Sequence, residues 1–160
     1  MEFFLDTEFL RTDELWLKLE KTADGDESRG WVPAYHFQIC LPDGTAVGKC
    51  DLRIGHNQNL YYGGNIGYRV EAEYRGHHYA GKACELLFKL AALHGMDSLI
   101  ITCNPENWPS RKTCEYVGCQ LETIADLPED NDMYLRGERQ VCIYRKKMNH
   151  ALGGCKAEGV

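Results

Sequence analysis

A short basic segment, residues 74–82, carries the side chains best suited to binding a charged ligand. It contains Arg75, Lys82 and two adjacent histidines, with glycines at Gly76 and Gly81. The segment lies between a predicted strand and a predicted helix, where the first N–H groups of the helix are unpaired and the helix dipole is positive. Basic side chains and close backbone approach suit a phosphate or pyrophosphate. The pattern indicates a phosphate-binding loop, although a basic helix start punctuated by glycines has the same composition.

Two better-known phosphate-binding motifs do not account for this segment. A Walker loop needs Ser or Thr where Ala83 stands, and no Gly-x-Gly-x-x-Gly is present. A nucleotide or a sugar phosphate therefore remains a possible ligand of the basic loop, but neither motif specifies one.

The eight cysteines form neither a disulfide pattern nor a metal pattern. No Cys-x-x-Cys pair occurs, and several cysteines stand inside apolar runs. The nearest approach to a ligand set is Cys114 and Cys119 with His77 and His78, whose spacing matches no zinc motif. We expect small buried thiols and no metal.

The elements that position the basic loop follow from hydrophobic periodicity. An apolar stripe at helical spacing predicts a helix over residues 79–94, ended by Gly95, and a shorter helix begins near Pro109 and ends at Gly118. The strand–helix–strand order over residues 66–103 predicts a right-handed parallel crossover. The expected strands are 15–20, 35–40, 47–54, 66–70, 99–103, 121–124 and 141–145, and the segments 57–64 and 126–132 are expected as loops.

Length and charge narrow the class of protein. The chain has 160 residues, which fit one domain, and a net charge of −6, which opposes general binding to nucleic acid or an anionic membrane. Neither a secretory signal nor an apolar run of about 20 residues is visible, so we expect a cytoplasmic protein. We assign residues 1–150 to a single domain and 151–160 to a mobile C-terminal tail.

Two motifs, taken together, resemble the GNAT superfamily of N-acetyltransferases. Residues 66–80 are similar to that family's acyl-CoA pyrophosphate loop. Residues 104–119 resemble its later motif, Asn-x-x-Ala/Ser followed by Tyr-Glu-x-x-Gly-Phe, with Asn107, Ser110 and Gly118 in place. The resemblance is strongest over residues 65–120 and strongly favours the phosphate-binding interpretation. It implies a mixed α/β (α+β) fold, in which a central mixed sheet with two splayed parallel strands is flanked by two helices.

The resemblance also implies where acetyl-CoA, as cosubstrate, lies. The pantetheine arm enters between strands 66–70 and 99–103, and the backbone N–H near Val70 polarises the thioester carbonyl. Asn107 and Ser110 contact the pantetheine or the start of the second helix. The cofactor-binding residues implied are Tyr68, Arg69, Val70, Arg75, Gly76, His77, His78, Tyr79, Ala80, Gly81, Lys82, Asn107 and Ser110.

Acetyl transfer to an amine requires two proton movements. The ammonium must lose a proton before attack, and the departing thiolate must gain one. Asp51, Glu71 and Glu73 are candidate bases, and the catalytic set that we assign is the Val70 N–H, Glu71 and Cys114. Cys114 stands where many relatives carry the proton-donating tyrosine, so a role in helix packing is the alternative for it.

His78 is a second departure from the family pattern, because it stands where the family usually has glycine. These two departures keep a rival function open: a CoA-binding sensor or interaction module with weak catalysis. Our first hypothesis is an acetyl-CoA-dependent N-acetyltransferase that uses direct attack in a ternary complex.

The acceptor amine, small molecule or protein, is not specified by the sequence, and neither is an oligomeric state. Residues 22–33 leave little room for the helical pair that GNAT domains usually place there, so we expect an open acceptor side. Trp31, Tyr35 and His36 are candidates for shaping it, with the segments 53–62 and 126–134. The acidic residues of the last segment favour a cationic amine.

Overall fold

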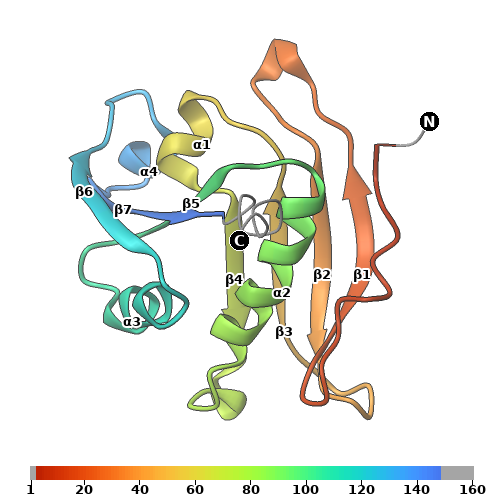
Figure 1. Ribbon diagram of the computed structural model, residues 1–160. Coiled ribbons are helices and arrows are strands. Elements are labelled where there is room, and N and C mark those ends of the chain that lie inside the picture. The colour runs from red at the N-terminus through yellow and green to blue at the C-terminus, as the bar shows by residue number, and fades with distance from the viewer. Residues whose placement is uncertain (1–2, 149–160) are drawn as a thin grey trace, which may run out of the picture.

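The computed structural model describes residues 3–148 as seven strands, four α-helices and two short 3-10 helices (Figure 1). The expected tail, residues 151–160, lies outside the described residues. The strands are β1 (Trp16–Ala23), β2 (Ala34–Cys40), β3 (Ala46–Arg53), β4 (Ile66–Val70), β5 (Ser98–Cys103), β6 (Gln120–Asp126) and β7 (Gln140–Lys147). The helices are α1 (Gln58–Gly63), α2 (Tyr79–Leu93), α3 (Trp108–Tyr116) and α4 (Asp132–Leu135), with η1 (Glu27–Arg29) and η2 (Ala72–Tyr74).

The strands form two sheets, where the sequence suggested one central sheet. The first has the order β1-β2-β3-β4 and is antiparallel throughout, and the second has the order β5-β7-β6. The sheets meet where the Asn65 N–H donates to the Ile100 carbonyl at 2.6 Å. Beyond this point β4 and β5 belong to different sheets, as expected for splayed strands.

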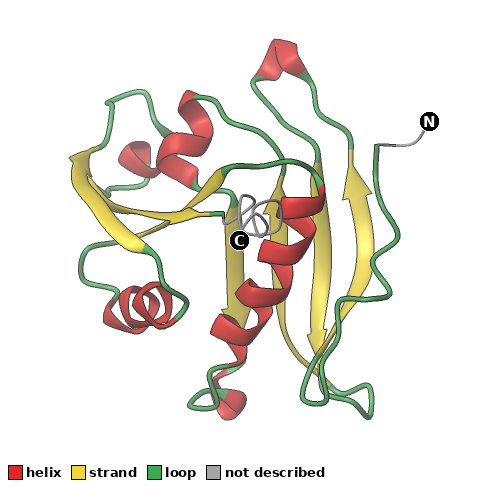
Figure 2. Ribbon diagram, viewed as in Figure 1, coloured by secondary structure: helices red, strands yellow, loops and turns green. Residues whose placement is uncertain are grey.

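Helix α2 covers one face of the first sheet, as Figures 1 and 2 show. Its apolar stripe, which includes Leu86, Leu87 and Leu90, is buried. Strand β2 alternates in the matching way, because Tyr35 and Phe37 are fully buried while His36 is only half-buried on the other face. The four-stranded sheet therefore has an apolar face under α2 and a polar face turned away from it.

Helix α1 lies in the segment 57–64, which we expected to be a loop, so that expectation was wrong. Helix α4 begins at the last residue of the expected loop 126–132. Both helices are short, and each begins at an asparagine cap: Asn57 Oδ1 accepts from the Leu60 N–H, and Asn131 Oδ1 from the Met133 N–H. Helices this short expose no long apolar stripe, so periodicity misses them, whereas the asparagine caps were a usable signal.

The cysteines of the described chain behave as expected. All seven are buried and free of disulfides: Cys40, Cys50, Cys84, Cys103, Cys114, Cys119 and Cys142. Within residues 3–148 no three His, Cys, Asp or Glu side chains lie close enough together to hold a metal ion. In the same residues, no helix has the length and apolarity needed to cross a membrane.

Candidate functional site

The edge of β4 that is not paired with β3, here called the outer edge of β4, presents backbone groups toward the second sheet. The Glu71 N–H donates to the Val47 carbonyl and the Gly67 N–H to the Asp51 carboxylate, so odd-numbered residues turn toward β3. Because an antiparallel ladder alternates, Tyr68 and Val70 turn their N–H groups to the outer edge. The predicted oxyanion donor thus has the orientation that its role requires.

Helix α2 starts after η2 and the loop that follows β4, and it keeps its first N–H groups available. His78 is the N-cap residue, and its side chain makes no capping hydrogen bond. The N–H groups of Tyr79, Ala80 and Gly81 precede the first intrahelical donor, Lys82, which bonds the His78 carbonyl at 2.9 Å. This uncapped helix start is the part of the loop best suited to an anion.

His78 adopts the left-handed backbone conformation that glycine would favour, with φ 62° and ψ 25°. Its imidazole stacks on the Tyr116 ring of α3, with centroids 4.3 Å apart and an angle of 8° between the planes. Gly81 completes this contact, because a Cβ there would lie 2.6 Å from Tyr116 Cδ2. The side chain of His78 is therefore directed at α3, and the loop keeps the turn that a glycine would give.

The basic side chains near the two helix starts are held by the protein itself. Arg75 Nε donates to the Val70 carbonyl at 2.9 Å, and Lys82 Nζ pairs with Glu14 at 2.9 Å. Arg111 donates to the Tyr144 hydroxyl at 3.0 Å and lies over the Trp108 ring. The main-chain donors, more than these cations, define the candidate anion site.

Helix α3 begins at Trp108 with Asn107 as its N-cap residue, close to the start expected near Pro109. Asn107 Oδ1 accepts from the Ser110 N–H at 3.2 Å, which caps the helix. The Ser110 hydroxyl lies 2.6 Å from the Tyr68 hydroxyl, and burial raises the pKa of that phenol, which keeps it protonated. The Tyr68 side chain therefore connects β4 to α3 across the predicted path of the pantetheine arm.

Cys114 is completely buried on the inner face of α3. A hydrogen bond with Cys119, together with burial, holds the pKa of its thiol well above the ordinary value. A buried, protonated thiol that already has a partner is poorly placed to reach a leaving group. The geometry favours the packing alternative for Cys114.

The three candidate bases differ in their surroundings. Glu71 and Glu73 are exposed residues just after β4. Asp51 is half-buried on β3: its carboxylate accepts the Gly67 N–H at 3.1 Å and pairs with Arg53 at 3.2 Å. A Cβ at Gly67 would lie 3.2 Å from Asp51 Oδ1, so the absence of a side chain there lets the carboxylate lean over β4.

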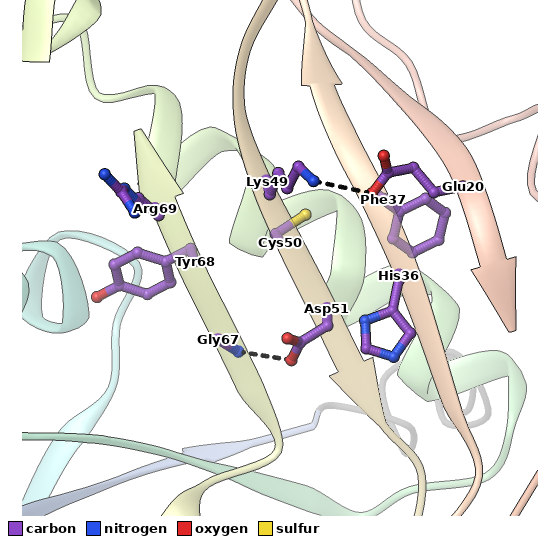
Figure 3. Close-up of a pocket in the computed structure, with 9 residues that line it drawn as sticks. All are labelled: Glu20, His36, Phe37, Lys49, Cys50, Asp51, Gly67, Tyr68 and Arg69. Atoms are coloured by element: carbon purple, nitrogen blue, oxygen red, sulfur yellow. Dashed lines mark hydrogen bonds and ion pairs between the residues drawn. The ribbon is translucent and has the colours of Figure 1, made fainter. Parts of the chain in front are cut away.

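A pocket of about 290 Å³ lies on the polar face of the first sheet, away from α2 (Figure 3). It extends from β1 to β4, and β4 contributes three consecutive residues to its lining. The lining residues are Glu20, His36, Phe37, Lys49, Cys50, Asp51, Gly67, Tyr68 and Arg69. The structure thus provides a polar pocket on the face of the first sheet that α2 leaves uncovered.

Of the residues expected to shape the acceptor side, His36 lines this pocket and Tyr35 does not. Tyr35 is fully buried under α2, where its hydroxyl accepts the Leu5 N–H and contacts His94 Nε2 at 2.6 Å. Strand alternation explains the difference, because neighbouring residues point to opposite faces. Trp31 is exposed outside the pocket, under the Arg29 guanidinium.

Comparison with known proteins identifies the family. The model of the acetyltransferase (GNAT) domain matches residues 2–120. The chain belongs to the GNAT acetyltransferase family. None of the curated proteins compared with the chain matches it.

Solved structures share the GNAT fold at low sequence identity. A GNAT-family acetyltransferase from Bacillus anthracis is 22% identical, with a TM-score of 0.56 over 71% of this chain and 66% of that one. The microcin C7 self-immunity acetyltransferase MccE, in complex with acetyl-CoA and AMP, is 22% identical, with a TM-score of 0.57 over 71% and 61%. An acetyltransferase from Salmonella typhimurium that modifies the N-terminal serine of ribosomal protein L7/L12 is 18% identical, with a TM-score of 0.58 over 77% and 67%. The GNAT chain described here thus spans about two thirds or less of the length of these proteins.

Two features of the site did not emerge from the sequence. Asn65 is fully buried at the junction of the sheets, and a lone asparagine before a strand carries no signal of that role. Lys49 and Arg69 share one end of the pocket because β3 and β4 pair in a register that the sequence leaves open. The register of β3 against β4 would have revealed that Lys49 and Arg69 face each other.

Proposed function

We propose that this chain is an acetyl-CoA-dependent N-acetyltransferase that moves an acetyl group to a primary amine by direct attack in a ternary complex. The observation that carries the proposal is the junction of β4 and α2. There, a strand edge with outward-facing N–H groups is followed, after the loop at residues 71–78, by an uncapped helix start. GNAT membership supplies the reaction class, and MccE, a similar structure, binds acetyl-CoA.

In this proposal the first two tasks fall to main-chain groups. The outer edge of β4, at Tyr68, Arg69 and Val70, pairs with the pantetheine arm. The Val70 N–H donates to the thioester oxygen, where negative charge develops during attack. The N–H groups at the start of α2 hold the pyrophosphate, with Gly76 and His77 in the loop before it.

The proton movements involve different groups. The acceptor ammonium loses its proton, through water, to a carboxylate; Asp51 is favoured over Glu71 because it lies in the pocket on the acceptor side. The amine nitrogen then bonds to the acetyl carbon and gives up a second proton to water, the carbon–sulfur bond breaks, and CoA leaves as a thiolate that takes a proton. Because Cys114 is buried, water is better placed to supply that proton.

Calorimetry with acetyl-CoA and with CoA tests the donor site. Binding of both ligands is expected, and absence of both would remove the proposal. Continuous detection of released CoA over a panel of amines then tests catalysis. Turnover with any amine supports the enzyme, whereas tight CoA binding without turnover favours the rival, a CoA-binding sensor or interaction module.

A further inference from the structure

The pocket on the polar face of the first sheet has an ordered pattern of charge. Two cations stand at one end: Lys49 and Arg69 are directly opposite each other on β3 and β4. Like charges in directly opposed positions repel, which destabilises a strand pair. In Figure 3 the two side chains diverge, with Lys49 turned toward Glu20 at 3.7 Å and Arg69 turned outward.

This cationic end is incompletely neutralised by the protein. The Lys49 side chain is 70% exposed and its ion pair with Glu20 is long. Arg69 is exposed and has no ion-pair partner within residues 3–148. Two exposed cations on adjacent strands are suited to hold one carboxylate or phosphate between them.

The other end of the pocket carries an imidazole and a carboxylate. His36 and Asp51 are directly opposite each other on β2 and β3, and Asp51 in turn faces Gly67 on β4. In Figure 3 the Asp51 carboxylate points to Gly67, and the His36 ring lies on the other side of Asp51. The Asp51 carboxylate suits an amine, because beside its ion pair with Arg53 it has further acceptor positions, which attract the ammonium form and accept its proton.

Strand geometry sets the spacing between the two ends. Lys49 and Asp51 are two residues apart on β3, as Gly67 and Arg69 are on β4. Two residues of strand span about 7 Å, so the ends lie on one face at that separation. The pocket volume of about 290 Å³ is at the lower end for ligand sites, which favours a small molecule.

We propose that the acceptor is a small primary amine that also carries a carboxylate or phosphate group. The anionic group lies between Lys49 and Arg69, and the amine lies at Asp51, whose carboxylate leans over Gly67 on β4. This inference rests on the proposed function, since it identifies the acceptor of that reaction. It adds an anionic group to the cationic amine that the acidic segment 126–134 favoured, and that segment does not line the pocket.

A homologous series of acceptors tests the inference. The amines are ω-amino acids and ω-aminoalkyl phosphates of two to six carbons, each compared with the alkylamine of the same length. We expect at least one chain length at which kcat/KM for the anionic amine exceeds that of the alkylamine about 10-fold, the worth of one exposed charge-assisted contact. Comparing kcat/KM for the amino acids with kcat/KM for the aminoalkyl phosphates shows which of the two anionic groups the pocket prefers. Equal values at every length would overturn the inference.

Arg69→Gln then tests the position of the anion. The preference, expressed as the ratio of the two kcat/KM values, is expected to fall about 10-fold, because one of two cations is lost. The ratio cancels any effect on acetyl-CoA that both amines share. Arg136→Gln, an exposed arginine outside the pocket, is the matched control and leaves the ratio unchanged. A ratio that Arg69→Gln does not change would overturn the placement.

Failure of this inference is distinguishable from failure of the proposed function. If acetyl-CoA does not bind in calorimetry, the proposed function itself is wrong. If CoA binds and no amine turns over, ligand-observed NMR with 6-aminohexanoate and the CoA-bound protein gives the answer without catalysis. Binding that Arg69→Gln weakens supports the pocket, and absence of binding overturns it.

Discussion

Asn65 and Ile100 join the two sheets through two hydrogen bonds. The Asn65 N–H donates to the Ile100 carbonyl at 2.6 Å, and Asn65 Oδ1 accepts the Ile100 N–H at 2.9 Å. The Asn65 amide also donates to the carbonyls of Arg53 and Gly55. One fully buried side chain therefore fixes the point from which β4 and β5 diverge, and hence the place where a pantetheine arm would enter.

Replacing Asn65 is expected to destabilise the fold. In Asn65→Leu the Ile100 N–H and two carbonyls lose their partners in a dry site, so the free energy of unfolding should fall by about 3 kcal/mol. Urea denaturation measures the loss. Asn131→Ala, which removes only a helix cap, is the comparison and should cost about 1 kcal/mol. Equal losses would contradict the assigned role of Asn65.

The left-handed backbone of His78 predicts how substitutions there behave. His78→Gly relieves about 1 kcal/mol of backbone strain but loses the ring contact with Tyr116, so stability should change little. His78→Val also loses the ring contact, and it adds backbone strain because a β-branched residue resists positive φ. We expect His78→Val to lower stability by about 2 kcal/mol and to weaken CoA binding in calorimetry. Tight CoA binding by His78→Val would show that this turn does not shape the anion site.

Cys114→Ala separates catalysis from packing. The Cys114 thiol is fully buried and hydrogen-bonded to Cys119. We therefore expect kcat of Cys114→Ala to stay within about twofold of the parent across pH 6–9, with a modest loss of stability. Steady-state kinetics and thermal unfolding measure the two effects. A large fall in kcat at high pH, without a matching loss of stability, would restore Cys114 as the proton donor.

Asp51→Asn tests the base. The amide can still accept the Gly67 N–H, but it cannot take a proton, so kcat at pH 7 should fall about 100-fold. The loss should shrink toward pH 10, where an amine of pKa near 10.4 loses its proton in solution. Glu71→Gln is measured alongside it. A 100-fold fall in Glu71→Gln with normal activity in Asp51→Asn would make Glu71 the base.

His94 gives the fold a defined dependence on pH. Burial lowers the pKa of His94, and the Tyr35 hydroxyl, which accepts the Leu5 N–H, is left to donate its proton to the neutral imidazole. The unfolded chain therefore binds a proton at higher pH than the folded one. Stability from this group is complete above the unfolded value of 6.5 and is lost as pH falls from there toward the lowered folded pKa. Urea denaturation from pH 7.5 to 5 should show this decline, and His94→Gln should flatten it.

Local sequence patterns determined much of the molecule. The stripe of α2 and the alternation in β2 specified which faces are apolar, because side-chain periodicity follows directly from helix and strand geometry. The basic loop and the Asn107–Ser110 spacing indicated the family, which the match over residues 2–120 confirms. The N-cap role of Asn107 was also foreseeable, because capping depends only on residues three positions away.

The tertiary structure decided how distant segments meet. It separated β4 from β5 at Asn65, buried Cys114, and placed Asp51 over Gly67 through a strand register that periodicity cannot supply. It also turned Arg75 and Lys82 onto protein partners, which left the main-chain N–H groups as the anion site. Sequence specified which groups are available within a few residues of one another. Long-range pairing, which depends on packing across the whole core, decided which of them can act together.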